Sequence, residues 1–291
     1  MILLDGKTLS AQLKDELRSE VEKIRAEGGK IPHLAAVLVG NNAASETYVA
    51  SKVRTCEQVG FGSSLVRLTP ETTEAELLAA IAGLNNDPEI DGFIVQLPLP
   101  KHIDENRILL AIAPEKDVDG FHPINFGRMA QGMSCYIPAT PYGMLQMLER
   151  YNIETSGKHA VIIGRSNIVG TPMSILLSRK GKDCTVTLTH SRTADLAAEV
   201  RRADIIVAAI GIPKFVTADM VKEGAIVLDV GINRIADATT KSGTRLVGDV
   251  DFEHVAPKCS YITPVPGGVG LLTVIALLQN TLKAARKEVY N

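Results

Sequence analysis

The sequence predicts an α/β protein built from two lobes. Apolar runs rich in Val and Ile alternate along the chain with segments whose apolar residues recur at helical spacing, a pattern typical of helices packed on mostly parallel sheets. The 291 residues exceed the length at which one hydrophobic core stops growing. We expect a first lobe over 1–138, a second lobe over 139–270, and a C-terminal helix over 271–291 that packs back on the first lobe.

In the first lobe, helical and strand patterns alternate. The capping-box pair Thr73 and Glu76 predicts the start of a helix at about residue 73. The expected elements are a helix over 8–27, a strand over 33–40, a helix within 43–59, a strand over 63–68, the helix from about 73, and a strand over 92–97.

Residues 113–138 show neither period and predict a long ordered loop that ends near the lobe boundary. After it, Thr140 and Pro141 form a favourable helix start, because a capping hydroxyl is followed by proline at the first helical position. A second α/β series then begins.

The second lobe is predicted to contain a doubly wound parallel sheet. Its strands are continuously apolar and are therefore expected to be buried on both faces. Strands are expected over 159–164, 185–190, 204–211 and 225–231, helices over about 170–181 and 193–202, and a last helix from Gly270.

Composition excludes several classes of function. The formal net charge is −2 and aromatic residues make up 4% of the chain, which does not suit a nucleic-acid partner. No apolar run approaches the roughly 18 residues of a membrane span, and the N-terminus becomes charged too early for a signal peptide. Four scattered cysteines without CxxC spacing suggest thiols in a reducing cytoplasm and no metal site.

A glycine-containing turn joins the strand at 159–164 to the next helix. Gly164 supplies the tight turn, and Ser166 and Gly170 keep the helix start slim enough for backbone amides to face phosphate oxygens. The string is GxSxxxG, so an ordinary strand-to-helix turn is the alternative. If it holds a dinucleotide, the second lobe is of Rossmann type.

The next strand ends in THSRT, without the acidic residue that an NAD enzyme places against the ribose hydroxyls. Arg165, Ser191 and Arg192 instead offer donors to a ribose phosphate, which favours NADP. Each arginine has the alternative of a solvated surface charge. The string DVGIN at 229–233, with Ile232, either contacts the nicotinamide or forms a plain turn.

Polar side chains in the first lobe suggest a ligand site. Tyr48 and Lys52 lie four residues apart on one helix, flanking its buried stripe. Tyr48 offers a flat ring, and Lys52 offers an amine whose pKa falls on desolvation. The alternative is a solvated lysine beside a half-buried tyrosine.

Two further positions suit the same ligand. Gln96 ends a buried strand, where open α/β sheets bind ligands, or is a structural amide. In KDVDG, Asp117 or Asp119 is suited to accept a forked pair of hydrogen bonds from an amino-pyrimidine edge, or to cap the loop.

Together these residues resemble the bifunctional methylenetetrahydrofolate dehydrogenase/cyclohydrolase family over nearly the whole chain. The matching strings are LDGK (4–7), SETYVASK (45–52), VQLPLP (95–100), KDVDGFHPIN (116–125), TPYGML (140–145), GRSNIVGTPM (164–173), HSRT (190–193), DVGIN (229–233), GDVDF (248–252) and TPVPGGVG (263–270).

The resemblance implies a folate-binding catalytic first lobe and an NADP-binding second lobe. It implies that Lys52 is the catalytic lysine, tuned by Gln96, that Tyr48 positions the pterin and that Asp119 anchors its amino edge. Gly164, Arg165, Ser166, Ser191 and Ile232 would contact NADP, and Pro266, Gly267 and Gly268 would line the folate site. A cytoplasmic homodimer in one-carbon metabolism and purine biosynthesis is implied as well.

The chain departs from the family pattern at two places. Ala139 stands where the family usually has Cys, and Leu271 and Leu272 stand where it has Pro-Met. The second departure is expected to reshape the start of the last helix. One alternative is a monofunctional dehydrogenase of the same family, or another two-lobe NADP enzyme that acts on a small acid. A second alternative is a binding protein that senses NADPH, which would be expected to lack Lys52 or Asp119.

Overall fold

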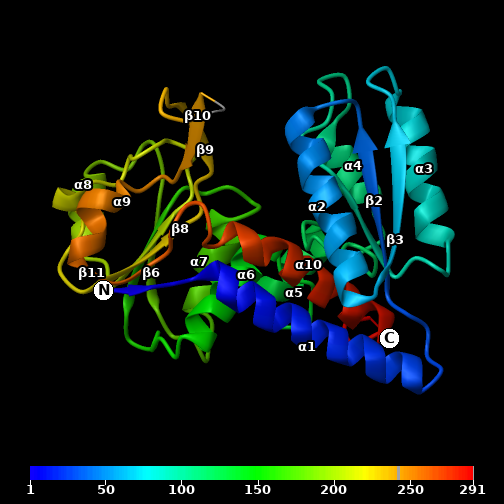
Figure 1. The fold of residues 1–291 in the computed structure, drawn as a ribbon, viewed down its shortest axis with the longest axis horizontal. Helices are drawn as coiled ribbons and strands as arrows, with labels where there is room; N and C mark the ends of the chain where they lie inside the picture. Colours follow the sequence, from blue (N-terminus) through cyan, green and yellow to red (C-terminus); the bar gives the residue numbers. More distant parts are fainter. Residues whose placement is uncertain (241–242, 291) are drawn as a thin grey trace. The chain divides into compact units, whose positions relative to one another are not determined.

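The computed structural model of the chain describes residues 1–240 and 243–290. It divides into two compact units: unit 1 is Met1–Ser10 with Thr140–Thr273, and unit 2 is Ala11–Ala139 with Val274–Asn291. Figure 1 shows the course of the chain by colour. The two-domain α/β fold predicted from the sequence is confirmed, and each unit is described below by itself.

The first ten residues differ from expectation, since they belong to unit 1. Strand β1 (Ile2–Leu3) pairs in parallel with Tyr261 and Ile262, and the Leu4 amide donates to the Ile262 carbonyl at 2.8 Å. A strand of two residues has no readable period, so the sequence pattern could not assign it to a sheet.

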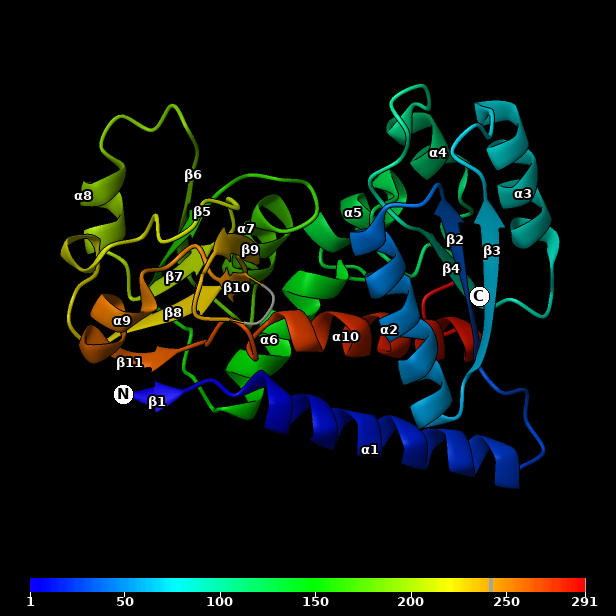
Figure 2. The same cartoon turned by 45° about the horizontal axis from the view of Figure 1, so that its top comes forward.

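Unit 2 contains a three-stranded parallel sheet in the order β3-β2-β4. Its strands are β2 (His33–Val39), β3 (Gly62–Leu68) and β4 (Gly92–Val95), which confirms the predicted strands with slightly shifted ends. Figures 1 and 2 show helix α2 (Ala43–Val59) on one side of these strands and α3 (Glu74–Asn86) on the other. Alternate β2 residues Ala35, Val37 and Val39 pack in the core that includes α3, as the period of two requires.

Helix α1 (Gly6–Ala26) buries Leu13, Leu17 and Val21 at helical spacing. The predicted capping box at the start of α3 is confirmed. The Thr73 hydroxyl accepts from the Glu76 amide at 3.3 Å, and the Thr73 amide donates to Glu76 Oε2 at 2.8 Å.

Two short helices of unit 2 were not predicted. They are α4 (Glu105–Ala111), capped by Asp104, and α5 (Pro123–Ala130), which lies within the segment expected to be a loop. The His122 ring caps α5 by accepting from the Ile124 amide at 3.1 Å. Helices of seven and eight residues are too short to display a 3.6-residue period, and α5 is held by burial of Asn125 and Met129.

Unit 1 contains a six-stranded parallel sheet in the order β1-β11-β8-β7-β5-β6. The predicted strands appear as β5 (His159–Ile163), β6 (Thr185–Thr189), β7 (Ile205–Ala208) and β8 (Ala225–Asp229), and the predicted helices as α7 (Gly170–Ser178) and α8 (Leu196–Arg201). The order reverses direction at β5, which pairs with β6 on one side and β7 on the other. Ligands of such sheets bind at this reversal, outside the carboxyl ends of the strands.

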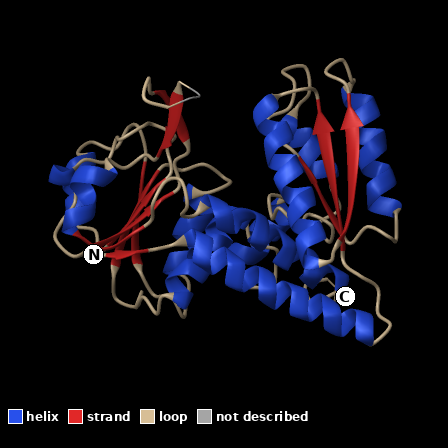
Figure 3. Ribbon diagram, in the orientation of Figure 1, coloured by secondary structure: helices blue, strands red, loops and turns tan. Residues whose placement is uncertain are grey.

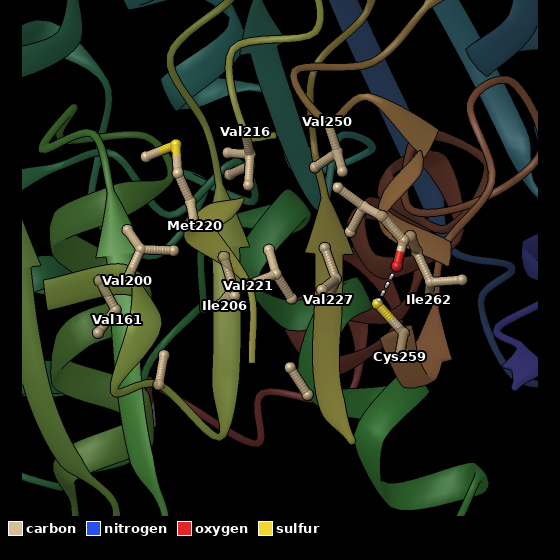
Figure 4. Packing of buried hydrophobic residues seen from close by; sticks show 14 of the residues in the cluster. Val161, Val200, Ile206, Val216, Met220, Val221, Val227, Val250, Cys259 and Ile262 are labelled. Atoms are coloured by element: carbon tan, nitrogen blue, oxygen red, sulfur yellow. Dashed lines mark hydrogen bonds between the residues drawn. The ribbon is translucent and has the colours of Figure 1, made fainter. Parts of the chain in front are cut away.

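The core of unit 1 packs on this sheet. Figure 4 shows Val161, Ile206 and Val227 from three neighbouring strands in one layer with Met220 and Val221. Cys259 lies at its edge, with its thiol donating to the Val255 carbonyl at 3.3 Å. The thiol is therefore packed as a small core side chain.

Several elements of unit 1 were not predicted, because each is short and weakly periodic. They are β9 (Asn233–Ala236), β10 (Thr244–Val247), β11 (Cys259–Ile262), α9 (Phe252–Val255) and the 3-10 turns η1 (Ala218–Met220) and η2 (Ala256–Lys258). Strands β9 and β10 pair antiparallel with each other, and Figure 3 shows this hairpin apart from the six-stranded sheet.

The predicted cap at Thr140 is wrong. Helix α6 (Ala139–Arg150) begins two residues before Pro141, the expected first helical residue, and the Thr140 hydroxyl lies 3.2 Å from the Thr273 hydroxyl. The Thr140 hydroxyl therefore contacts Thr273, which is distant in the sequence, and does not cap the helix as the local sequence predicts.

Helix α10 (Gly270–Ala285) begins where expected. Its residues from Val274 onward belong to unit 2, where the Asn280 side chain donates to the carbonyls of Val118 and Ile137, both at 2.8 Å. The expectation that the C-terminal helix packs on the first lobe is therefore confirmed. No helix in the described part of the chain is both long and apolar enough to cross a membrane.

Candidate active site and cofactor-binding turn

In unit 2 the structure brings Lys52 and Gln96 together. Lys52 Nζ donates to Gln96 Oε1 at 3.0 Å. The other end of the amide, Nε2, donates to the Leu97 carbonyl at 2.7 Å. Because the NH₂ group is held by that carbonyl, the amide oxygen is the end turned toward the amine.

The positions of both side chains follow from the local structure. Val49 and Cys56 bury one face of α2, which leaves Lys52 half-buried at the edge of that face. Gln96 directly follows β4, and its backbone amide donates to the Val37 carbonyl at 2.9 Å. Gln96 therefore stands at the carboxyl edge of the sheet, as the sequence predicts.

Asp119 shares this environment. Burial lowers the pKa of the Lys52 amine below its ordinary value, and the negative charge of Asp119 opposes part of that shift. Burial also raises the pKa of the Asp119 carboxyl, and the positive charge of Lys52 opposes it. The two groups therefore interact electrostatically. Because the Lys52 pKa is lowered, a larger fraction of the amine is neutral near neutral pH.

The two aspartates of KDVDG have different surroundings. Asp117 is buried and accepts from the His122 amide at 2.8 Å, the Asn125 side chain at 2.9 Å and the Phe121 amide at 3.3 Å. Its oxygens are thus occupied by the loop itself, which leaves Asp119 as the carboxylate for a ligand. Sequence alone did not separate the two.

The buried Asp117 is expected to make the stability of unit 2 depend on pH. Burial raises its pKa to about 7, against hydrogen bonds from His122 and Asn125 that lower it. The folded chain then binds more protons than the unfolded chain between about pH 4 and 7, so stability falls as pH rises through this range, by on the order of 4 kcal/mol.

The measurement compares urea unfolding of the unaltered chain and of Asp117→Asn at about pH 5 and about pH 8. The variant is expected to lose less stability on going to the higher pH. All other titrating groups, including His122, Asp119 and Lys52, are present in both proteins. The difference between the two profiles therefore reports the titration of Asp117 together with its coupling to charged neighbours such as Asp119. Parallel profiles would contradict the assignment.

Tyr48 lies one helical turn before Lys52 on α2. Its side chain is 47% exposed, so its ring is accessible to a ligand, and only its place on the same helix connects it with Lys52.

In unit 1, the turn after β5 is built on close backbone contacts. Gly164 has φ +108°, and a Cβ there would collide with the carbonyl oxygen of Ala209. A Cβ on Gly170 would collide with the carbonyl oxygen of Gly164. The Ser166 hydroxyl accepts from the amides of Val169 and Gly170 at 3.2 and 3.5 Å. The turn therefore has the shape that a dinucleotide needs for close backbone approach.

The groups expected to meet a ribose phosphate are exposed beside this turn. Arg165, Ser166, Ser191 and Arg192 all face solvent. The segment after β6 is shaped by the His190 amide, which donates to the Thr193 hydroxyl at 3.0 Å, and by the Arg192 amide, which donates to His190 Nδ1 at 3.1 Å. Two hydrogen bonds from backbone amides to side chains thus fix the loop that presents Ser191.

A pair of buried carboxylates, which the sequence analysis did not single out, orders the loops after β7 and β8. Asp249 accepts from the amides of Ile210 and Gly211 at 2.7 and 2.9 Å. Asp229 accepts from the amides of Gly231 and Asp249, both at 2.9 Å. Burial raises the pKa of Asp229 to about 6, and the amide donors oppose it. The strings DVGIN and GDVDF contain both residues, but their pairing is a long-range contact.

Ile232 follows this network and is 48% exposed. A hollow of about 190 Å³ lies at the carboxyl ends of β8 and β11 and is lined in part by Asp229, Pro264, Val265 and Arg245. Its lining does not include Gly164 or Ser191, so it is separate from the turn after β5.

Pro266, Gly267 and Gly268 also belong to unit 1 and are described with it. A Cβ on Gly6 would collide with the Gly268 carbonyl, and one on Gly268 would lie 2.5 Å from the Pro264 carbonyl. The LDGK segment at the N-terminus therefore packs directly against this loop. Lys52 is part of unit 2, so the expected place of these three residues at the folate site stays a prediction.

The departures from the family pattern fall in both units, with Leu271 and Leu272 in unit 1 and Ala139 in unit 2. Leu272 is fully buried, Leu271 is 43% exposed and Ala139 is buried. A Cβ on Gly143 would lie 2.8 Å from Leu272 Cβ, so the glycine allows α6 to approach the start of α10 closely, whichever side chain stands at position 272. The helix start is closed by the Leu272 amide, which donates to the Val269 carbonyl at 2.9 Å.

Among residues 1–240 and 243–290, no three His, Cys, Asp or Glu side chains are grouped so that they would hold a metal ion.

Comparison with known proteins identifies the family. Two family models match: the tetrahydrofolate dehydrogenase/cyclohydrolase catalytic domain over residues 4–119, and the NAD(P)-binding domain of the same family over residues 138–289. The chain belongs to this family. It is accordingly an enzyme, a dehydrogenase and cyclohydrolase with an N-terminal catalytic domain and a C-terminal NAD(P)-binding domain.

Individual relatives are similar to this chain over nearly their full lengths. The bifunctional protein FolD of Flavobacterium johnsoniae is 63% identical over 98% of both chains, and that of Cytophaga hutchinsonii is 62% identical over 98% of this chain and 99% of the relative. The crystal structure of FolD from Campylobacter jejuni superimposes with a TM-score of 0.94 at 49% identity, covering 99% of each chain. The enzyme of Trypanosoma brucei, complexed with NADP cofactor and inhibitor, gives 0.93 at 37% identity over 100% of this chain and 99% of that one.

Proposed function

We propose that the chain oxidises 5,10-methylenetetrahydrofolate to 5,10-methenyltetrahydrofolate with NADP and hydrolyses the product to 10-formyltetrahydrofolate, with Lys52, Gln96, Asp119 and Tyr48 as the residues at the folate. The observation that carries the assignment is the bond from Lys52 Nζ to Gln96 Oε1, made by an amine whose pKa is lowered by burial. Such an amine is suited to act as a base near neutral pH.

The cofactor is NADP, and its fit is supported by the turn after β5. Backbone collisions exclude side chains at Gly164 and Gly170, and a cradle of this kind suits a pyrophosphate at a helix N-terminus. Gly164, Ser166 and the amides that begin α7 would hold the pyrophosphate, Arg165 and Ser191 the ribose phosphate, and Ile232 the nicotinamide side. When bound, NADP supplies the acceptor for a hydride.

In the oxidation the chain needs to abstract no proton, because the lone pair of a folate nitrogen assists departure of the hydride. The contribution of the residues is therefore to hold the donor carbon in place. Asp119 anchors the amino edge of the pterin and Tyr48 lies against its ring. A fully charged Lys52 would oppose the growing cation, so its lowered pKa also favours this step.

In the hydrolysis Lys52 positions and deprotonates the attacking water. Hydroxide adds to the methenyl carbon, and the proton taken from water is held on Lys52 Nζ. One carbon–nitrogen bond then breaks as the hydroxyl loses its proton and becomes the formyl carbonyl on the other nitrogen. Of the two protons from water, one is delivered to the freed nitrogen and the other is released to solvent, so methenyl cation and water give the formyl product and H⁺. Gln96 Oε1 accepts a hydrogen bond from the amine and so orients its lone pair toward the water.

Replacement of Asp119 by Asn tests the folate assignment. Loss of a charge-assisted hydrogen bond is expected to raise the KM for methylenetetrahydrofolate by roughly 10- to 100-fold. Because Asp119 holds the Lys52 pKa up, the acid limb of the hydrolysis pH profile is expected to move to lower pH. The KM for NADP is expected to stay unchanged, because the cofactor turn belongs to unit 1.

The matched control is Asp15→Asn, which removes an exposed carboxylate of unit 2 paired with Arg18 at 2.8 Å. Both enzymes are assayed by absorbance in steady state. An Asp119→Asn enzyme with the folate KM of the Asp15→Asn control would overturn the proposed role of Asp119.

We further propose a cytoplasmic homodimer that supplies one-carbon units for purine biosynthesis. The four cysteines are free and buried, which suits a reducing compartment. The subunit mass is 31.2 kDa, so light scattering in solution distinguishes a dimer from a monomer.

A further inference from the structure

The loop that carries Asp119 is tied to the C-terminal end of the chain. Tyr290 Oη donates to Asn125 Oδ1 at 2.8 Å, and Asn125 Nδ2 donates to Asp117 Oδ2 at 2.9 Å. Asp117 lies two residues before Asp119. The relay therefore runs from Tyr290 through the Asn125 side chain to the carboxylate of Asp117, in the loop that presents the candidate folate ligand.

Asn125 can relay this constraint because its orientation is set by all four of its contacts. The side chain is fully buried. Its Nδ2 also donates to the Pro114 carbonyl at 2.9 Å, and its Oδ1 also accepts from the Tyr136 amide at 3.4 Å. The Tyr290 hydroxyl is the shorter of the two donors to Oδ1 and comes from the far end of the sequence.

Residues Glu288–Tyr290, called here the C-terminal strap, are held over this loop by several contacts. The guanidinium carbon of Arg128 lies 4.8 Å from the centre of the Tyr290 ring, and Arg128 Nη2 donates to the Val289 carbonyl at 3.3 Å. The rings of Tyr290 and Tyr136 lie 5.9 Å apart. All these residues belong to unit 2.

We propose that the C-terminal strap positions Asp119 against Lys52, with Tyr290 and Asn125 as the positioning residues. The inference rests on the proposed function of Asp119. Without the Tyr290 hydroxyl, Asn125 Oδ1 keeps only its longer bond, from the Tyr136 amide. Three of the four contacts then hold the side chain, so it tilts more readily relative to Asp117. Only Val118 separates Asp117 from Asp119, so a tilt is passed on to the carboxylate that holds the pterin.

The test is Tyr290→Phe, which removes one hydroxyl and keeps the ring between Arg128 and Tyr136. The KM for methylenetetrahydrofolate is expected to rise roughly fivefold, with the NADP KM unchanged. Because Asp119 raises the Lys52 pKa, its displacement also moves the acid limb of methenyl hydrolysis to lower pH. A purely structural role for the strap would leave that pH limb in place.

Arg128→Met loosens the same strap independently and is expected to act in the same direction. The control is Tyr151→Phe, which removes a hydroxyl that accepts from the Asp5 amide at 2.8 Å in unit 1. Thermal unfolding and the NADP KM report whether each variant is folded. If Tyr290→Phe matches Tyr151→Phe while Asp119→Asn loses folate affinity, the strap proposal is wrong. If Asp119→Asn itself has no effect, the proposed function of Asp119 fails instead.

Discussion

Replacement of Lys52 by Met is expected to abolish hydrolysis of methenyltetrahydrofolate while leaving NADP binding intact. Methionine keeps much of the length of the side chain and fits a half-buried site, but it has no basic atom that takes up a proton near neutral pH and no donor for Gln96. Loss of a general base costs on the order of 10²- to 10⁴-fold. Oxidation of methylenetetrahydrofolate is expected to fall less, because that step requires positioning and no proton abstraction.

The chain offers a matched control for this variant. Lys14 Nζ donates to Gln58 Oε1 at 3.0 Å on the surface of unit 2, the same chemical pair at the same distance as Lys52 and Gln96. Lys14→Met removes that bond without touching the candidate site, and its two activities should stay near those of the unaltered enzyme. Separate absorbance assays of oxidation and hydrolysis measure both. Full hydrolysis by Lys52→Met would refute the assignment of the base.

Gly164→Ala is expected to weaken NADP binding on the order of a hundredfold. The residue has φ +108°, and its new Cβ would press against the Ala209 carbonyl and lie 3.1 Å from Ile210 Cγ2. Both contacts lie just after β7, so the turn must shift relative to its neighbour and the amides at the start of α7 move with it. Hydrolysis of methenyltetrahydrofolate, assigned to unit 2, should persist.

A second glycine separates backbone strain from collision. Gly181 has φ +88° with no atom within 4 Å of an added Cβ, so Gly181→Ala introduces strain of about 1 kcal/mol or more without a clash. Calorimetric titration of both variants with NADP measures the difference. Equal NADP affinities in the two variants would mean that the close contact with Ala209 does not shape the cofactor turn.

Elements with a long, regular pattern were predictable from the sequence. The buried strands of both sheets, helices α1, α2 and α10, and the capping box of Thr73 and Glu76 follow from local periodicity and local hydrogen bonding. The hairpin β9–β10, strand β1 and helix α5 were not, because short elements are stabilised by partners that are distant in the sequence. Thr140 shows the same effect, since its hydroxyl lies beside Thr273.

The candidate site divides in a similar way. The chemical types at Lys52, Gln96 and Asp119, and the glycines of the turn after β5, could be named from spacing and strand position. The choice between Asp117 and Asp119, and the roles of Asp229 and Asp249, depended on which backbone amides reach each carboxylate.

The sequence by itself determined the two-lobe α/β fold, the family and the residue types available for chemistry, because these are set by local pattern and by ordered motifs. Only the tertiary structure decided which carboxylate of the KDVDG loop is already hydrogen-bonded, that Gln96 turns its oxygen to Lys52, and that Tyr290 reaches Asn125. These are contacts between segments far apart in the chain. These contacts are determined by burial and by hydrogen-bond geometry, and neither can be inferred from the spacing of residues in the sequence.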